Sequence, residues 1–173
     1  MASLTKSALI TGSSRGIGRG IALKLAEQKV KIAINYVKNE AAAKDTLAKV
    51  REKGSDGFVV QADVCQPQEI QRMFAKAKSE FGNLNIFVSN ARTEVPSFYS
   101  SPMNITLEQW DTAMNSQAKA FLVGVREAVA LMEEGGRVIA ITSLLVAAPE
   151  AGSPGSPWAR QKLRWNRFAG ISR

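Results

Sequence analysis

The sequence predicts an α/β protein in which a parallel sheet lies between two layers of helices. Short apolar runs alternate five times with stretches whose apolar residues recur at helical spacing. The runs are apolar nearly throughout, as in strands buried on both faces of a parallel sheet. Strand and helix in regular alternation are typical of a three-layer αβα domain with right-handed crossovers.

The first half of the chain contains three strand–helix pairs. After the first strand, Ile17, Ile21 and Leu25 follow helical periodicity. Gly54 and Gly82 end the second and third helices, because glycine is the usual residue just past a helix end. In chain order the expected strands and helices are 7–11, 17–29, 31–36, 40–53, 57–62 and 66–81.

The second half contains two more strands, 85–89 and 136–142, on either side of one long helix within 106–132. Thr106 is the expected N-cap of this helix, and Gln109, three residues later, is its capping-box partner. With these elements the sheet has five strands and ends on 136–142.

The last part of the chain differs in composition. Residues 147–157 consist mainly of Ala, Gly, Ser and Pro, which is typical of a linker or an unfolded segment. Residues 144–173 then carry five Lys/Arg and one acid, out of a net charge of +8 for the whole chain. We expect one domain over 1–146, and a linker with a basic tail, disordered or non-native, over 147–173.

The composition also limits the chemistry. No histidine is present, which excludes a Ser-His-Asp triad and most zinc sites. The single cysteine, Cys65, cannot form an internal disulfide, so we expect a reducing cytoplasm. No apolar run reaches the roughly 18–20 residues of a membrane span, and we expect neither a membrane nor a metal to be involved.

A glycine-rich loop, 11–18, joins the first strand to the first helix. Gly12 permits a tight turn, Gly16 lets the backbone approach a pyrophosphate, and Gly18 lets the helix pack on the sheet. Phosphates bound there would meet backbone N–H groups and the positive end of the helix dipole. This context predicts a Rossmann-type dinucleotide site, and the alternative is a Gly/Ser turn without a ligand. The residues expected to contact the cofactor are Gly12, Ser14, Arg15, Gly16, Ile17 and Gly18.

The end of the second strand predicts NADP(H) rather than NAD(H). An NAD-binding domain commonly has an acid there, which binds the ribose 2′-hydroxyl, but this strand ends Asn35-Tyr36-Val37-Lys38. Arg15 and Lys38 can bind a 2′-phosphate instead, and Tyr36 is expected to contribute to the same site. The alternative is that Arg15 and Lys38 are solvated surface charges.

The spacing Gly-x-x-x-Gly-x-Gly in 12–18 resembles that of the short-chain dehydrogenase/reductase family, and the resemblance covers about residues 5–143. It implies that Asp63 accepts a hydrogen bond from the adenine amino group and that the Val64 backbone contacts the ring. Taken alone, Asp63 is also typical of a turn or a helix N-cap. The resemblance further implies that Asn90 and Ala91 stabilise the sheet and lie along the cofactor ribose, although Arg92 replaces the family's next glycine.

The resemblance implies two catalytic residues. Asn115 matches a helix asparagine that holds a proton-relay water, and Ser143 matches the substrate-orienting serine. The alternatives are a polar residue on an amphipathic helix and an ordinary strand-end serine.

The family's acid/base tyrosine, and the lysine that lowers its pKa, have no counterpart at the usual spacing. Positions thirteen and seventeen residues after the expected serine hold Ser156 and Arg160, and the chain's two tyrosines are Tyr36 and Tyr99. A frame-shifted reading of permitted codons for 159–172 resembles the family's active-site helix. We therefore hypothesise an out-of-frame ending, with the family's C-terminal strands missing. The alternative is a genuine basic-aromatic segment that binds nucleic acid or an anionic membrane.

Within the family, the resemblance points to NADPH-dependent enoyl and 3-oxoacyl (acyl-carrier-protein) reductases of fatty-acid synthesis. We expect an oxidoreductase that reduces an enoyl- or 3-oxoacyl-thioester, free or on acyl-carrier protein, does not bind nucleic acid, and forms a homodimer or homotetramer if intact. The alternative is a catalytically inactive fragment that binds nucleotide or only oligomerises. The segments that carry this resemblance are Gln66-Pro67, Met73-Phe74, Phe81-Gly82, Trp110-Asp111, Met114-Asn115 and Ala118-Lys119-Ala120.

Overall fold

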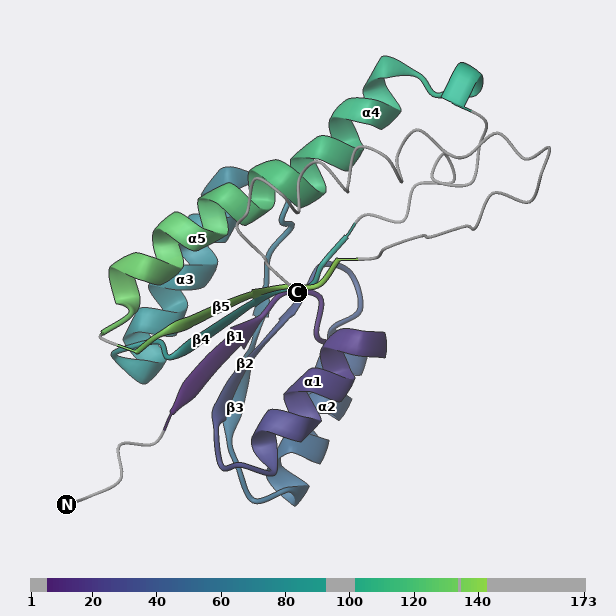
Figure 1. Cartoon of the computed structure of the whole chain (residues 1–173). Helices are drawn as coiled ribbons and strands as arrows, with labels where there is room; N and C mark the ends of the chain where they lie inside the picture. Colours follow the sequence, from purple (N-terminus) through teal and green to yellow (C-terminus); the bar gives the residue numbers. More distant parts are fainter. Residues whose placement is uncertain (1–5, 93–101, 134, 143–173) are drawn as a thin grey trace, which may run out of the picture. The chain divides into compact units, whose positions relative to one another are not determined.

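A computed structural model describes residues 6–92, 102–133 and 135–142. In these residues all strands are parallel and form one sheet in the order β3-β2-β1-β4-β5 (Figure 1), which confirms the predicted α/β fold class. The strands are β1 (Ser7–Ile10), β2 (Lys31–Tyr36), β3 (Gly57–Gln61), β4 (Ile86–Ser89) and β5 (Arg137–Ala140). Ala8 of β1 lies opposite Ile32 of β2 and Ile86 of β4, so β1 is the central strand.

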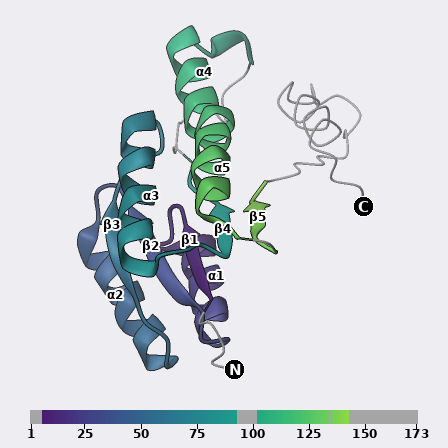
Figure 2. The same ribbon diagram turned by 90° about the vertical axis from the view of Figure 1, so that its left-hand side faces the viewer.

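Helices cover both faces of the sheet (Figures 1 and 2). α1 (Gly16–Ala26) and α2 (Glu40–Glu52) lie on one face, and α3 (Pro67–Phe81) and α5 (Ala120–Leu131) lie on the other. Successive side chains of β1 enter the two layers in turn, because side chains alternate along a strand. Ala8 and Ile10 pack in the core beneath α1 and α2, and Leu9 packs in the core beneath α3 and α5.

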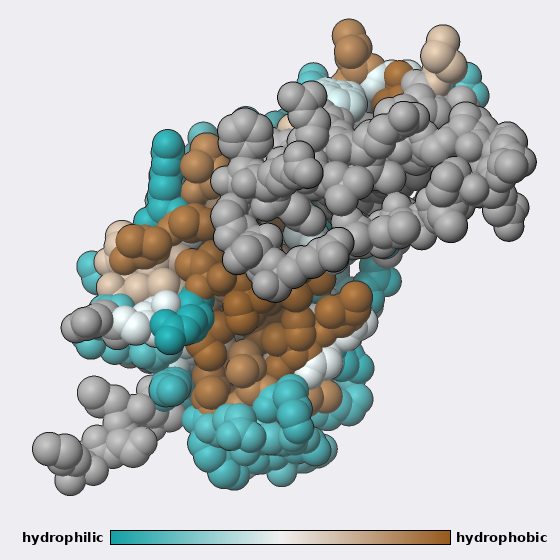
Figure 3. Space-filling view, in the orientation of Figure 1, coloured by the Kyte–Doolittle hydropathy of each residue, from teal (hydrophilic) through white to brown (hydrophobic). Residues whose placement is uncertain are grey.

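β5 pairs with β4 and stands at the end of the described sheet. Its side chains stay partly accessible, with Val138 37% and Ile139 45% exposed. Figure 3 shows hydrophobic surface along this strand and the neighbouring part of α5, where Leu122 and Val129 are also exposed.

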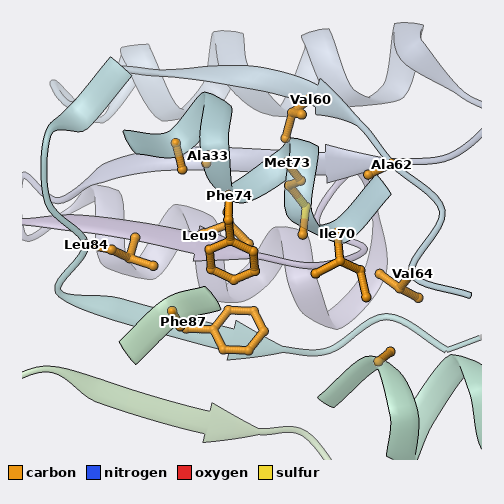
Figure 4. Close-up of a cluster of buried hydrophobic side chains, with 13 residues drawn as sticks. Leu9, Ala33, Val60, Ala62, Val64, Ile70, Met73, Phe74, Leu84 and Phe87 are labelled. Atoms are coloured by element: carbon orange, nitrogen blue, oxygen red, sulfur yellow. The ribbon is translucent and has the colours of Figure 1, made fainter. Parts of the chain in front are cut away.

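The core beneath α3 and α5 is built around aromatic side chains (Figure 4). Phe74 of α3 meets Phe87 of β4 edge-on, with ring centroids 5.2 Å apart. Both rings are buried, and each such side chain stabilises the fold by about 1.5–3 kcal/mol. Gly124 lets α5 approach this pair, since a Cβ there would lie 2.6 Å from the Phe87 Cζ atom.

The described residues belong to two units. One contains the sheet and comprises the described residues of 1–93 and 111–141, and the other comprises the described residues of 94–110 and 142–173. The predicted domain boundary at residue 146 lies outside the described residues.

The second unit includes a short 3-10 helix, η2 (Pro102–Asn104), and the first residues of α4 (Leu107–Met114). The predicted capping box of α4 is confirmed there. The Thr106 N–H donates to Gln109 Oε1 at 3.0 Å, and the Gln109 N–H donates to Thr106 Oγ1 at 3.2 Å.

Two helices differ from the prediction. α1 ends at Ala26 rather than at residue 29, because the chain turns back toward β2 with Lys29 at a φ of 60°. The helix expected over 106–132 contains a π turn, η3 (Asn115–Lys119), between α4 and α5. The Ser116 hydroxyl donates to the Ala113 carbonyl at 3.2 Å, a bond that competes with the backbone ladder of the helix.

The other element ends lie within two residues of the prediction, which is the usual scatter at element termini. At β5, for example, Arg137–Ala140 replaces the expected 136–142, although the Ile141 N–H still donates to the Ser89 carbonyl at 2.9 Å.

Candidate functional site

The glycine loop leaves β1 at Thr11 and enters α1 at Gly16. Gly12 and Gly16 have φ values of +64° and +57°, in the left-handed region that favours glycine. A Cβ on Gly12 would lie 3.0 Å from the Ala91 Cα, whereas no atom lies within 4 Å of a Cβ placed on Gly16. Gly12 therefore makes the predicted tight turn, and the backbone at Gly16 is open to an approaching group.

Gly18 allows close packing, but against a different neighbour from the one expected. A Cβ there would lie 2.6 Å from the Asn90 Nδ2 atom and 2.6 Å from the Gly12 carbonyl oxygen. The prediction that Gly18 brings the helix against the sheet is therefore corrected. Gly18 brings the start of α1 against its own loop and against the residue that follows β4.

Asn90 joins the carboxyl ends of the two central strands. Its Nδ2 group donates to the Thr11 carbonyl at 2.9 Å and to the Gly12 carbonyl at 3.3 Å. In return, Thr11 Oγ1 accepts from the Asn90 N–H at 2.9 Å and from the Ala91 N–H at 3.0 Å. These bonds link the end of β1 to the end of β4, and the contact of Asn90 and Ala91 with a ribose stays a prediction.

Asn35 and Ser13 support the same loop, and sequence reasoning did not assign either a role. The Asn35 Oδ1 atom accepts from the Gly12 N–H at 2.9 Å, and its Nδ2 group donates to the Ala62 carbonyl at 3.0 Å. The Ser13 hydroxyl donates to the Ile10 carbonyl at 2.7 Å and accepts from the Asn35 N–H at 3.1 Å. Both side chains are fully buried. The available signal was one amide within the otherwise apolar end of β2.

Asp63 lies in the turn between β3 and α3. Its Oδ1 atom accepts from the Cys65 N–H at 2.9 Å, and its own N–H donates to Glu69 Oε2 at 2.7 Å. The turn role, one of the two alternatives for Asp63, is therefore present. The Val64 side chain is buried in the core, so the predicted contact of Val64 with adenine would use its backbone.

The cationic side chains predicted to bind a 2′-phosphate are accessible. Arg15, at the N-cap of α1, and Lys38, just after β2, are both exposed, and Tyr36 is buried at the end of β2. The first turn of α1 contains no acidic residue, and Arg15 makes no side-chain capping bond there. Ile17, in the same turn, is 67% exposed. This helix end is therefore electropositive and accessible.

The strand order reverses between β1 and β4, and ligands of such sheets bind outside the carboxyl ends of the strands at this point. A small cavity, with room for about one water molecule, lies there. It is lined by Thr11, Ser89, Ala91 and Ser116, among others. Ser116 belongs to the π turn that Asn115 begins, and the Asn115 carbonyl accepts from the Ala120 N–H. The structure thus brings the π turn beside the strand ends, while Ser143 lies outside the described residues.

The family follows from comparison with known proteins. A family model described as "Enoyl-(Acyl carrier protein) reductase" matches residues 12–155. The chain belongs to the short-chain dehydrogenase/reductase family. It is 34% identical over 154 residues to the 3-oxoacyl-(acyl-carrier-protein) reductase FabG of Staphylococcus aureus, an alignment that covers 88% of this chain and 60% of that relative. The chain thus spans about 60% of the length of this curated relative.

Two solved structures with a bound nicotinamide cofactor resemble this chain. A short-chain dehydrogenase from Burkholderia cenocepacia in complex with NADP matches with a TM-score of 0.82 and 30% identity, covering 95% of this chain and 66% of that one. A blue fluorescent protein from a metagenomic library in complex with NADPH matches with a TM-score of 0.81 and 30% identity, covering 94% and 65%.

Two further observations concern this family member. Arg92, which replaces the glycine expected after Ala91, is exposed, and Lys29 is the one non-glycine residue with positive φ among the described residues. Arg92 therefore causes no backbone strain where it stands. In the same described ranges, no group of three or more potential metal ligands occurs, and no helix is long and apolar enough to cross a bilayer.

Proposed function

We propose that this chain binds NADP(H) and that the intact protein reduces an enoyl- or 3-oxoacyl-thioester presented on acyl-carrier protein. The observation that carries the proposal is the glycine loop, with the backbone at Gly16 open and Arg15 exposed beside it. NADP and NADPH in the matched solved structures support the cofactor, and FabG among the relatives supports the substrate class.

The residues present fit this cofactor. A Cβ at Gly16 would point into open space that a pyrophosphate can use, and the first N–H groups of α1 have no partners within the helix. Arg15 and Lys38 would bind the 2′-phosphate, with Tyr36 beside them. Bound NADPH supplies a hydride from nicotinamide C4 to the β carbon of an enoyl group or to a ketone carbon.

The remaining roles concern orientation and water. Asp63 would accept from the adenine amino group, with Val64 against the ring, and Asn90 and Ala91 would lie along the ribose. Asn115 would hold a water for proton relay, and Ser143 would orient the substrate. We propose the cytoplasm as the compartment, because the chain's single cysteine, Cys65, cannot form an internal disulfide, and a homo-oligomer as the state of the intact protein.

A second candidate function is nucleotide binding without turnover. It is favoured by Ser156 and Arg160, which stand where the family has its acid/base tyrosine and lysine. A serine hydroxyl and a guanidinium do not titrate near neutral pH, so neither residue can replace a tyrosine as acid/base.

One purified sample separates the two candidates. NADPH and NADH are titrated by fluorescence into the full chain and into Arg15→Ala, with Arg72→Ala, an exposed cation of α3, as the charge-matched control. Arg15→Ala should weaken the binding of NADPH by about tenfold or more, the value of a charge-assisted hydrogen bond, and should leave the binding of NADH nearly unchanged. The control should bind both cofactors like the wild type.

Turnover is measured on the same sample as NADPH oxidation with crotonyl and acetoacetyl thioesters. Turnover supports the reductase, and binding without turnover supports the second candidate. A folded wild type that binds neither cofactor would contradict both candidates, and equal losses of both cofactors in Arg15→Ala would contradict the preference for NADP(H).

A further inference from the structure

The carbonyl oxygen of Ser14, in the glycine loop, is held by two side chains from neighbouring helices. The Thr46 hydroxyl of α2 lies 2.9 Å from it and 3.0 Å from the Ala42 carbonyl of its own helix, so these two acceptors share its one proton. The Arg19 guanidinium of α1 donates to the Ser14 carbonyl from Nη2 at 2.8 Å and from Nε at 3.2 Å. Thr46 is fully buried, although its helix is otherwise amphipathic and exposed on one side. A buried hydroxyl directed at a loop carbonyl indicates that the position of this loop is specified from α2.

Arg19 also binds α2 itself. Its Nη2 group donates to the Ala42 carbonyl at 3.2 Å, and its Nη1 group forms an ion pair with Asp45 at 3.1 Å. The Asp45 carboxylate in turn accepts from Lys49 at 2.9 Å. We define the Ser14 clamp as Arg19 and Thr46, which bind the Ser14 carbonyl, together with Asp45, which binds Arg19.

The clamp connects the two elements that carry the proposed 2′-phosphate ligands. Fixing the Ser14 carbonyl fixes the plane of the peptide that leads into Arg15. On the other side, α2 begins at Glu40 with Asn39 as its N-cap, which accepts from the Ala42 N–H at 2.8 Å, and Lys38 directly precedes Asn39. Arg19 binds the carbonyl of that same Ala42. The clamp therefore joins the backbone at Arg15 to the start of the helix that follows Lys38.

The pyrophosphate part of the site has separate supports. Gly12 is held by Asn35 and Asn90, and Gly18 packs against Asn90. None of these contacts involves Thr46 or Arg19. Loss of the clamp should consequently change the separation of Arg15 and Lys38 more than it changes the position of the backbone at Gly16.

We propose that Thr46 and Arg19 are positioning residues that hold Arg15 and Lys38 at the separation a 2′-phosphate requires, and so set the preference for NADP(H) over NAD(H). The proposal rests on the proposed binding of NADP(H). It concerns residues that act through the Ser14 carbonyl rather than as ligands of the 2′-phosphate.

The test compares Thr46→Val, which keeps the shape of the side chain and removes its hydroxyl, with Thr46→Ser, which keeps the hydroxyl. Dissociation constants for NADPH and NADH are measured on the full chain, together with the thermal unfolding midpoint. Thr46→Val should weaken NADPH by about tenfold, the upper value of one net hydrogen bond. It should weaken NADH by less than about threefold, because NADH lacks the 2′-phosphate. Thr46→Ser should retain the wild-type ratio of the two constants.

A second variant, Arg19→Gln, changes a partly exposed side chain and carries the same test if Thr46→Val does not fold. An unchanged ratio of the two constants in the folded variant, whether both affinities fall together or neither falls, overturns the proposal while leaving the proposed function intact. A wild type that binds neither nucleotide overturns both. A rise in the NADPH dissociation constant relative to the NADH constant, with NADH binding preserved, supports positioning over a merely structural role.

Discussion

Asn35 accepts the Gly12 N–H at 2.9 Å through Oδ1 while its Nδ2 group donates to the Ala62 carbonyl at 3.0 Å. One fully buried side chain thus links the glycine loop to the residue that follows β3. Because a buried N–H without a partner is costly, this link fixes the direction in which the loop leaves β1.

We predict that Asn35→Leu, which is close in size but cannot hydrogen-bond, lowers the free energy of unfolding by about 1–3 kcal/mol or more, since it leaves buried backbone groups without partners. Urea unfolding measures this change. Asn104→Leu, at an exposed position of η2, is the control and should change stability by less than about 0.5 kcal/mol. Equal effects of the two substitutions would show that the buried link is unimportant.

Gly18 and Gly20 lie in the same helix and should respond oppositely to alanine. A Cβ at Gly18 would lie 2.6 Å from the Gly12 carbonyl oxygen, whereas nothing lies within 4 Å of one at Gly20. Gly20→Ala should stabilise the protein by about 0.5–1 kcal/mol, the difference in helix propensity. Gly18→Ala should destabilise it by about 1–3 kcal/mol and should weaken the binding of NADPH. Thermal unfolding of the two variants decides the matter, and a stabilising Gly18→Ala would contradict the packing described.

Asp45 should make stability depend on pH. Its pKa is below the ordinary value, first because Lys49 donates to the carboxylate and also because Arg19 lies beside it. A lowered folded-state pKa stabilises the protein above the unfolded-state pKa of about 3.9, and this stabilisation is lost as the pH falls through the folded-state value. Asp45→Asn should therefore lose less stability than the wild type on acidification from pH 5 to about pH 3.

The effect will be small because Asp45 is half exposed, so it is measured as a difference between urea unfolding curves at the two pH values. Asp111→Asn, at an exposed position of α4, is the matched control. Parallel acid dependence in the wild type and Asp45→Asn would contradict the prediction.

The exposed side chains of β5 should promote association. Ile139 is 45% exposed on a strand that pairs on one side within the described sheet, and such edges bind other chains. Ile139→Lys should reduce concentration-dependent light scattering. Leu107→Lys, which removes an apolar side chain that is 82% exposed on α4, should reduce it less. A larger reduction of light scattering by Leu107→Lys than by Ile139→Lys would show that association involves α4 rather than β5.

The sheet and its helices were predictable because local and global signals agree. The strands are mainly apolar, and glycines with positive φ stand at residues 54 and 82, where the predicted helices end. The end of α1 was not predictable, because Lys29 adopts the left-handed conformation that glycine favours without being glycine. The π turn was missed for a similar reason, since Asn115–Lys119 contains neither glycine nor proline.

The candidate site was predictable as far as its glycines, which follow from the backbone that a phosphate requires. Several of its supports were not, because they join residues far apart in the sequence. Asn35 binds Gly12 and Ala62, and Thr46 binds Ser14 across 32 positions. Only the fold brings these groups together, so their contacts cannot be predicted from spacing along the chain.

Many supports of the glycine loop come from one stretch of chain. Ser13, Arg19, Asn35 and Thr46, and the carbonyl of Ala62 that Asn35 binds, all precede α3. From beyond α3, the Val88 carbonyl, Asn90 and Ala91 bind the loop at Thr11 and Gly12. We therefore expect the first three strands to set the nucleotide preference as a unit. Exchanging that stretch between two relatives, with a matching Asn-Ala pair after β4, should transfer the preference without redesign of the second half of the domain.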